Sequence, residues 1–134
     1  MIIVDTNIIV HLHITSEWTA QAERAFQKDP DWAAPLLWRS EFLNVLTGYI
    51  RRKTISITEA QQIMGDALRV MEGNEIPASP LHILELTTIS TCTAYDCEFV
   101  ALAQDLGIKL VTMDKQLLAR FPGTAVELGK FTGN

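Results

Sequence analysis

Two short apolar runs, each followed by an aspartate, set the strongest limit on how this chain can fold. Residues 1–4 are apolar, rich in isoleucine and valine, and are closed by Asp5; residues 108–112 repeat the pattern before Asp114. Such runs are typical of strands buried on both faces of a sheet. Stretches of helical period lie between them, at about 17–28, 38–52, 58–72, 80–90 and 94–106. Strands that alternate with helices predict a parallel sheet covered by helices on both faces.

The chain is long enough for one domain with one hydrophobic core. It has 134 residues, of which 48% are hydrophobic and 20% are charged, so neither disorder nor a small disulfide-linked scaffold is expected. Weaker extended segments near 32–35, 74–77 and 124–127 supply further strands. We therefore expect a single domain over 1–134, with disorder confined to the last residues from about 130.

The sequence carries no sign of a membrane segment or of a zinc site. No apolar run approaches the roughly 20 residues that cross a bilayer, so we expect a cytoplasmic protein without membrane contact. Cys92 and Cys97 are the only cysteines, and no nearby histidine completes a tetrahedral metal site with them. We assign them no chemistry.

Two of the acidic residues follow predicted strands. Asp5 and Asp114 each stand directly before a helical segment, so each can cap the N-terminus of that helix with its side-chain oxygen. Taken singly, capping is the simpler interpretation of both residues. A functional role rests on their position relative to other acids.

Two further acids lie on predicted helices, close to the buried face. Glu41 comes one helical turn after Trp38, within an apolar stripe that continues along the helix, and Asp96 shares a side of its helix with Phe99. A buried carboxylate costs several kcal/mol unless it is paired or coordinated. Asp96 has a structural alternative, a capping box with Thr93.

These four acids are expected to converge. In a parallel α/β sheet the carboxyl ends of the strands and the starts of the following helices share one edge. Carboxylates gathered there repel one another unless a hard divalent cation lies among them, and Mg²⁺ or Mn²⁺ suits all-oxygen ligands best. Glu98 is another candidate acid near Asp96. Because it lies two residues from Asp96 on the predicted helix, we expect it to be on the opposite side and to face solvent.

The net charge fits this interpretation. A formal charge of −5 argues against a nucleic-acid partner, because basic surfaces attract phosphate. Cations bound by four carboxylates would leave −5 − (−4) = −1, which largely removes the objection.

Four stretches of the sequence resemble the PIN domain, and in particular the small VapC-type toxins of bacterial and archaeal toxin–antitoxin pairs. The resemblance spans nearly the whole chain in the expected order, with a mild departure at Phe99, where many relatives carry tyrosine. The stretches are Val4-Asp5-Thr6-Asn7, Ser40 to Leu46, Thr93 to Asp96 running into Ala101-Leu102-Ala103, and Val111-Thr112-Met113-Asp114.

The resemblance implies a fold, a site and partners. The fold is a three-layer α/β/α PIN-like fold with a central parallel sheet of about four to five strands. The activity is that of a metal-dependent endoribonuclease, in which a metal-activated water hydrolyses RNA. A homodimer and a cognate antitoxin are the implied partners. The implied metal-binding and catalytic acids are Asp5, Glu41, Asp96 and Asp114, with Asn7 and Thr112 supporting them by hydrogen bonds.

Basic residues near these segments have two interpretations. Arg51, Arg52 and Lys53 end the helix that carries Glu41, where cations favour the helix dipole, but they could also contact RNA phosphates. Lys115 follows Asp114 and is a further candidate for RNA contact.

Two other functions stay open. A PIN-like module that binds RNA or protein without cleavage would keep the fold. A Mg²⁺-dependent phosphoryl-transfer domain would share the sheet and the first aspartate, but such phosphatases usually carry a second acid where this chain has Asn7.

Overall fold

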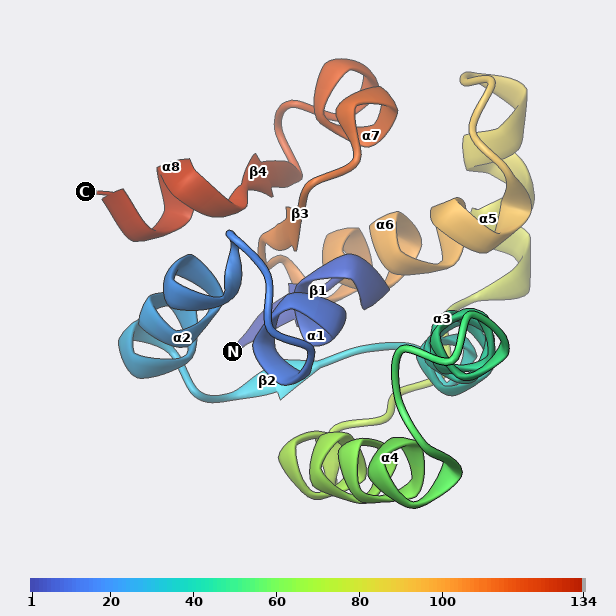
Figure 1. Ribbon diagram of the computed structural model, residues 1–134. Coiled ribbons are helices and arrows are strands. Elements are labelled where there is room, and N and C mark those ends of the chain that lie inside the picture. The colour runs from blue at the N-terminus through green and yellow to red at the C-terminus, as the bar shows by residue number, and fades with distance from the viewer. Residues whose placement is uncertain (134) are drawn as a thin grey trace.

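The computed structural model describes residues 1–133, which are built around a sheet of four parallel strands (Figure 1). The strand order is β2-β1-β3-β4, so β1 and β3 are the central pair. The parallel sheet and its predicted strand number are confirmed. The strands are β1 Ile2–Val4, β2 Trp32–Ala33, β3 Leu110–Thr112 and β4 Ala125–Glu127.

Helices connect the strands, and most of them match the predicted helical stretches within a few residues. The sequence also places extended chain at 74–77, where the structure has only an isolated parallel bridge between Ala34 and Glu75. The helices are α1 Thr6–His13, α2 Thr19–Lys28, α3 Leu37–Arg51, α4 Ile57–Met71, α5 Pro80–Thr88, α6 Ala94–Leu106, α7 Lys115–Arg120 and α8 Leu128–Gly133.

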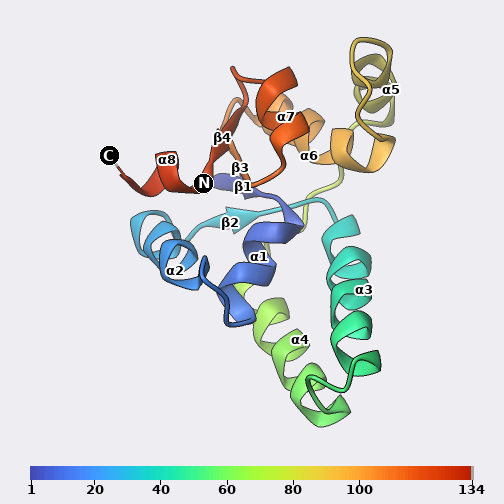
Figure 2. The ribbon, with the colours of Figure 1, turned by 45° about the horizontal axis from the view of Figure 1, so that its top comes forward.

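The helices form a layer on each face of the sheet. Figure 2 shows α5, α6 and α7 above the sheet and α1, α2 and α4 below it. The reason is topological: the β1-to-β2 and β2-to-β3 connections run across the sheet in opposite directions, and right-handed crossovers then place α1 and α2 on one face and α5 and α6 on the other. Helix α4 belongs to the second connection but packs against α1 and β2, on the face of α1 and α2. Both central strands are buried. The three-layer α/β/α architecture is confirmed.

The register of the central strands aligns the two aspartate-bearing ends. Ile3 pairs with Leu110 and Val4 with Val111, so Asp5 follows β1 beside Thr112 at the end of β3. The Asp5 N–H donates to the Val111 carbonyl at 3.0 Å. The pairing of β1 with β3 thus places both predicted strand-end acids at the same edge of the sheet.

The start of α3 is fixed to the segment between α4 and α5. Glu75 accepts hydrogen bonds from the Trp38 indole at 2.9 Å and from the Arg39 guanidinium at 2.5 Å. Trp38 is fully buried. These contacts hold the first turns of α3, and with them Glu41, against the rest of the fold.

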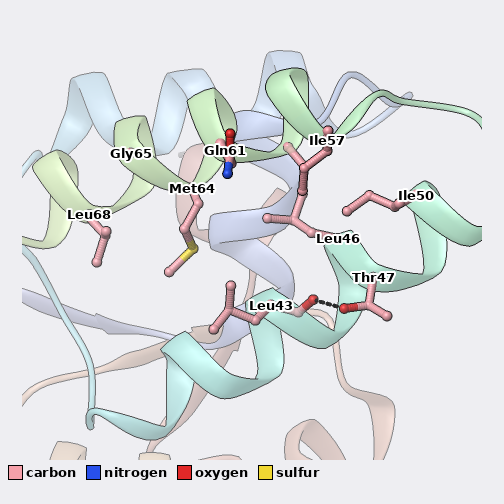
Figure 3. A pocket seen from close by; sticks show the side chains of 10 residues that line it. Leu43, Leu46, Thr47, Ile50, Ile57, Gln61, Met64, Gly65 and Leu68 are labelled. Carbon is pink, nitrogen blue, oxygen red and sulfur yellow. Dashed lines mark hydrogen bonds between the residues drawn. The ribbon is translucent and has the colours of Figure 1, made fainter.

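An apolar groove of about 410 Å³ lies between α3 and α4. Figure 3 shows side chains of the two helices pointing toward one another across it. Leu43 and Ile57 are 49% and 59% exposed, so the rim of the groove is open to solvent. The apolar residues that line it include Leu43, Leu46 and Ile50 of α3 and Ile57, Met64 and Leu68 of α4.

The chain continues as α8 to Gly133, in a segment where the sequence predicts disorder from about residue 130. Leu128 at its start is fully buried, and the Lys28 ammonium donates to the Phe131 carbonyl at 2.5 Å. These contacts hold α8 against α2. Asn134 lies outside the described residues. Across residues 1–133, none of the helices combines the length and the apolar character that crossing a membrane requires.

Candidate active site

Asp5 is the most deeply buried of the four predicted acids, with 7% of its surface exposed. It ends β1 and caps α1, because its Oδ1 accepts from the Thr6 N–H at 2.8 Å. Its Oδ2 accepts from the Thr112 hydroxyl at 2.7 Å and from the Asn7 amide at 3.4 Å. The capping interpretation is therefore right, and it leaves the carboxylate held at the sheet edge.

Asp114 is joined to Asp5 through Thr112. The Thr112 hydroxyl, which donates to Asp5, accepts from the Asp114 N–H at 3.0 Å. The Asp114 side chain caps α7 by accepting from the Gln116 and Leu117 N–H groups at 2.8 and 3.2 Å. Thr112 is fully buried, so one internal hydroxyl links the ends of β1 and β3.

Asn7 bridges the same two strand ends on another side. Its amide donates to Asp5, and its Oδ1 accepts from the Met113 N–H at 3.2 Å. The predicted supporting residues, Asn7 and Thr112, are thus both in hydrogen-bond contact with Asp5. Asp5, Asn7, Thr112 and Asp114 form a group that we call the strand half of the site.

Glu41 and Asp96 approach from helices, and we call them the helix half of the site. Glu41 Oε1 accepts from the Thr6 hydroxyl at 2.6 Å, which connects α3 to the start of α1. Asp96 lies in the first turn of α6, where its N–H donates to the capping Thr93 hydroxyl at 3.1 Å. Both side chains are half-buried.

The two halves line one open pocket of about 310 Å³, which we call the acid pocket. All four predicted acids face it, and no lysine or arginine is among its lining residues. Convergence at the sheet edge, which the topology predicted, is therefore what the fold produces. The lining residues are Asp5, Thr6, Asn7, Val10, His11, Glu41, Val45, Asp96 and Asp114.

Burial and mutual repulsion raise the pKa values of Asp5, Glu41 and Asp96. Burial raises the pKa of Asp5 from 3.8 to about 6, although hydrogen bonds from Thr112 and Thr6 oppose the shift and the charges of Glu41 and Asp96 add to it. The pKa values of Glu41 and Asp96 are raised too, mainly by burial. Uncompensated negative charge is the main electrostatic property of the pocket.

The donor chemistry of the acid pocket fits a hard divalent cation, because the acids offer only oxygen ligands and no lysine or arginine lines the pocket. Their spacing is open, however. Within residues 1–133, no three His, Cys, Asp or Glu side chains are close enough together to hold a metal ion. The four carboxylates line the pocket walls rather than surround a single point.

Glu98 corrects an expectation from the sequence. We expected it to face solvent, but it is half-buried, and both burial and the charge of Glu41 raise its pKa. The helical spacing from Asp96 predicted that Glu98 lies on the opposite side of α6 from Asp96. That spacing carries no information about α3, which brings Glu41 close to Glu98.

His11 is a pocket residue that the sequence reasoning missed. It lies one turn after Asn7 on α1 and lines the acid pocket. Its Nδ1 is 3.1 Å from the Ser16 hydroxyl, and burial lowers the pKa of the ring. The signal that could have found it is the spacing of four from Asn7, which places both residues on one face of the helix.

The predicted RNA-contacting residues are outside the acid pocket. Arg51 and Arg52 lie at the far end of α3, followed by Lys53, roughly 15 Å along the helix axis from Glu41 at 1.5 Å per residue. Lys115 is exposed at the start of α7, beside Asp114. The structure therefore separates the acids from the basic residues, although one helix carries both Glu41 and the arginines.

Comparison of the sequence with known proteins identifies a family and a relative. A family model described as the PIN domain matches residues 2–123. Ribonuclease VapC3 of Pyrobaculum aerophilum is 27% identical over 124 residues, which are 90% of this chain and 95% of that protein.

Two solved structures share the fold across almost their whole length. The protein PAE2754 from Pyrobaculum aerophilum superposes with a TM-score of 0.77 at 22% identity, covering 99% of this chain and 97% of that one. A toxin–antitoxin complex from Klebsiella pneumoniae contains a chain with a TM-score of 0.70, also at 22% identity, covering 96% of this chain and 98% of the other.

Proposed function

The chain belongs to the PIN domain family, and from this premise we propose that it is a metal-dependent endoribonuclease that hydrolyses RNA phosphodiester bonds. The observation that carries the proposal is the acid pocket, which four carboxylates line and no lysine or arginine does. The similarity to Ribonuclease VapC3 supports RNA as the substrate.

We propose Mg²⁺, with Mn²⁺ as an alternative, as the cofactor, and Asp5, Glu41, Asp96 and Asp114 as the residues that hold it. Bound there, the cation would supply an activated water and would stabilise negative charge on the reacting phosphate. Asn7 and Thr112 would keep Asp5 oriented through the hydrogen bonds that they donate to its Oδ2.

Each half of the site has a separate task in this proposal. The strand half fixes two carboxylates: that of Asp5 accepts from the Thr112 hydroxyl, and that of Asp114 accepts from the Gln116 and Leu117 N–H groups. In the helix half, Glu41 is held by the Thr6 hydroxyl, and Asp96 projects from the start of α6. The carboxylates thus approach the pocket from several elements, and no side-chain nucleophile is required for the hydrolysis.

The test is cleavage of a whole-cell RNA pool in Mg²⁺, with chelated samples as blanks. We expect Asp5→Asn and Asp96→Asn to reduce cleavage by more than about a hundredfold, because each removes a charge that holds the cation. Glu23→Gln, at an exposed carboxylate of α2, is the matched control and should cleave like the wild type.

The outcomes separate the open functions. Full activity in both pocket variants would refute the assignment of the acids. A folded wild type that binds RNA but cuts none in Mg²⁺ or Mn²⁺ would favour the binding module instead. Transfer of a phosphoryl group to the protein itself would favour the phosphoryl-transfer alternative.

We further propose that the chain is the toxin of a type II toxin–antitoxin pair, with a cognate antitoxin as partner. The structural similarity to a chain in a toxin–antitoxin complex supports this assignment. Expression of the chain alone should arrest growth, and co-expression with the product of any short reading frame that adjoins its gene should relieve the arrest and yield a stable complex. A neighbouring product that does neither would contradict the pairing.

The homodimer predicted from the sequence is also part of the proposal, with the helices spanning 38–72 as the interface. The exposed apolar groove between α3 and α4 lies in this region, and exposed apolar patches commonly mark interaction sites. We expect Leu43→Glu to convert a dimer to a monomer in sedimentation experiments. Leu84→Glu, at a leucine of α5 that is 61% exposed, is the control and should leave the dimer intact. If Leu43→Glu also stays dimeric, the interface lies elsewhere.

A further inference from the structure

One side of α3 connects the acid pocket to a second cleft. Glu41, Val45, Gly48 and Arg52 follow one another at spacings of four, three and four, so they lie along one stripe of the helix. Val45 lines the acid pocket and also the second cleft, of about 500 Å³, which the later residues of α3 form. We call this the α3 cleft; Val45 is where the two hollows meet.

The guanidinium of Arg52 is folded back along this stripe. A side chain at Gly48 would bring its Cβ to 3.1 Å from an Arg52 Nη1 atom, so glycine provides the space that the guanidinium occupies. The same guanidinium lies over the Tyr49 ring, 4.9 Å from its centroid. Its charge is therefore set at the level of residue 48, roughly 10 Å along the helix axis from Glu41.

The arginines of the α3 cleft have no acidic partner. Among the described residues, the ion pairs involve other cations, and none includes Arg51 or Arg52. An arginine stacked on an aromatic ring keeps the N–H groups at its edge available for a planar, doubly hydrogen-bonded contact with phosphate. These two arginines are therefore free to bind an anion.

Without a bound cation, the acid pocket does not attract a nucleic acid. Its four carboxylates repel phosphate, and no lysine or arginine lines it. In that state a polyanionic substrate must gain its binding free energy from cations beside the pocket. The α3 cleft is the adjoining hollow that offers them, since it shares Val45 with the acid pocket.

We propose that the α3 cleft binds the RNA backbone next to the cleaved phosphate, with Arg52 as the main contact and Arg51 as the second. The strand would run from the acid pocket over Val45 to the Arg52 guanidinium, which Gly48 and Tyr49 keep in place. This inference rests on the proposed ribonuclease function and adds to it the path of the substrate.

The experiment measures the affinity of the full chain for a fluorescent single-stranded RNA of about twelve nucleotides in a chelator, where no metal-dependent cleavage occurs. Arg52→Gln should weaken binding by about tenfold. It should also lower the slope of log affinity against log salt by about 0.7, the contribution of one phosphate contact on a single strand. Arg24→Gln, at an exposed arginine of α2, is the matched control and should change neither quantity.

Gly48→Ala gives a second, charge-neutral test. The added methyl group would lie 3.1 Å from the Arg52 Nη1 atom, so the guanidinium must shift by a few tenths of an ångström, which should weaken RNA binding by about twofold. Alanine also favours a helix more than glycine does, so the thermal stability of the chain should rise while its affinity falls. If Gly48→Ala raises the thermal stability but leaves the affinity for RNA unchanged, the folded-back Arg52 guanidinium does not contact the RNA.

Other outcomes overturn the proposal without touching the ribonuclease function. If Arg52→Gln binds RNA like the wild type and only loses thermal stability, the arginine serves the helix dipole. If its RNA affinity is unchanged but it no longer binds poly-glutamate, the cleft belongs to an acidic protein segment. Conversely, a wild type that binds RNA through Arg52 but never cleaves it would refute the nuclease activity and keep the cleft.

Discussion

The strand half and the helix half of the acid pocket contribute the same chemical group in different settings. In the strand half, Asp5 accepts three hydrogen bonds and Asp114 caps a helix with two. In the helix half, Glu41 accepts one hydrogen bond from Thr6. The Asp96 N–H donates to the Thr93 hydroxyl, and this hydroxyl lowers the pKa of the Asp96 carboxylate against the larger effect of burial.

This contrast distinguishes acids that stabilise the fold from acids whose role is functional. The strand-half acids stabilise the helices that follow them, so the fold depends on them whether or not the chain is an enzyme. The helix-half acids bring raised pKa values and little stabilisation in return. Their presence at half-buried positions is best explained by a ligand that needs negative charge.

The largest expected effect concerns the burial of Asp5. Its pKa is about 6 in the folded chain against 3.8, so the folded chain holds the proton more tightly. The contribution of Asp5 to the free energy of unfolding therefore increases as the pH falls from above 6 toward 3.8, and it is lost as the pH rises through 6. The difference amounts to about 3 kcal/mol at 1.36 kcal/mol per pKa unit.

The measurement is urea unfolding in a chelator between pH 7.5 and 3, for the wild type and for Asp5→Asn. Subtracting the two curves removes the contributions of groups that do not interact with Asp5, and the wild type should gain about 3 kcal/mol relative to the variant on acidification. A flat difference would mean that the carboxylate is not desolvated as the structure indicates.

Mg²⁺ should produce the next largest effect, and here both halves should respond alike. A cation that binds only the folded chain stabilises it by about 2.7 kcal/mol at one hundred times its dissociation constant. We expect that gain in thermal unfolding of the wild type, and its loss in Asp5→Asn and Asp96→Asn. The control Glu23→Gln should keep it; a gain that survives in Asp96→Asn would exclude the helix half from the metal site.

Replacing the shared hydroxyl should distinguish the halves by stability. Thr112→Val removes the donor to Asp5 and the acceptor of the Asp114 N–H at a fully buried position. The free energy of unfolding should fall by about 2 kcal/mol. Thr132→Val, which removes a hydroxyl that bonds only within α8, is the control and should cost less than about 1 kcal/mol.

The smallest expected effect is on the helix half. Asp96→Asn removes a repelled, half-buried charge, so the free energy of unfolding without metal should rise slightly at pH 7, by no more than about 0.5 kcal/mol. Chemical denaturation at one pH is sufficient to measure it. A loss above about 1 kcal/mol would show that Asp96 has a structural duty after all, and the contrast between the halves would fail.

The sheet and the four acids could be predicted because they depend on order along the chain. Asp5 and Asp114 end apolar runs, and parallel topology places the ends of strands at one edge. The environment of Glu98 could not be predicted in the same way. It depends on how α3 packs against α6, and periodicity within one helix carries no information about the helix beside it. The short α8 was missed because its six residues, unlike those of α7 after Asp114, follow no favoured capping residue.

The hydrogen bonds around Asp5 all point the same way, with a consequence for the acid pocket. The Thr6 N–H, the Thr112 hydroxyl and the Asn7 amide each donate to the carboxylate, and the Thr112 hydroxyl, which accepts from the Asp114 N–H, directs its single proton to Asp5. The surroundings are thus organised for an anion while burial favours the neutral acid. This is local frustration in the energy landscape, and a bound cation would relieve it by satisfying both demands at once.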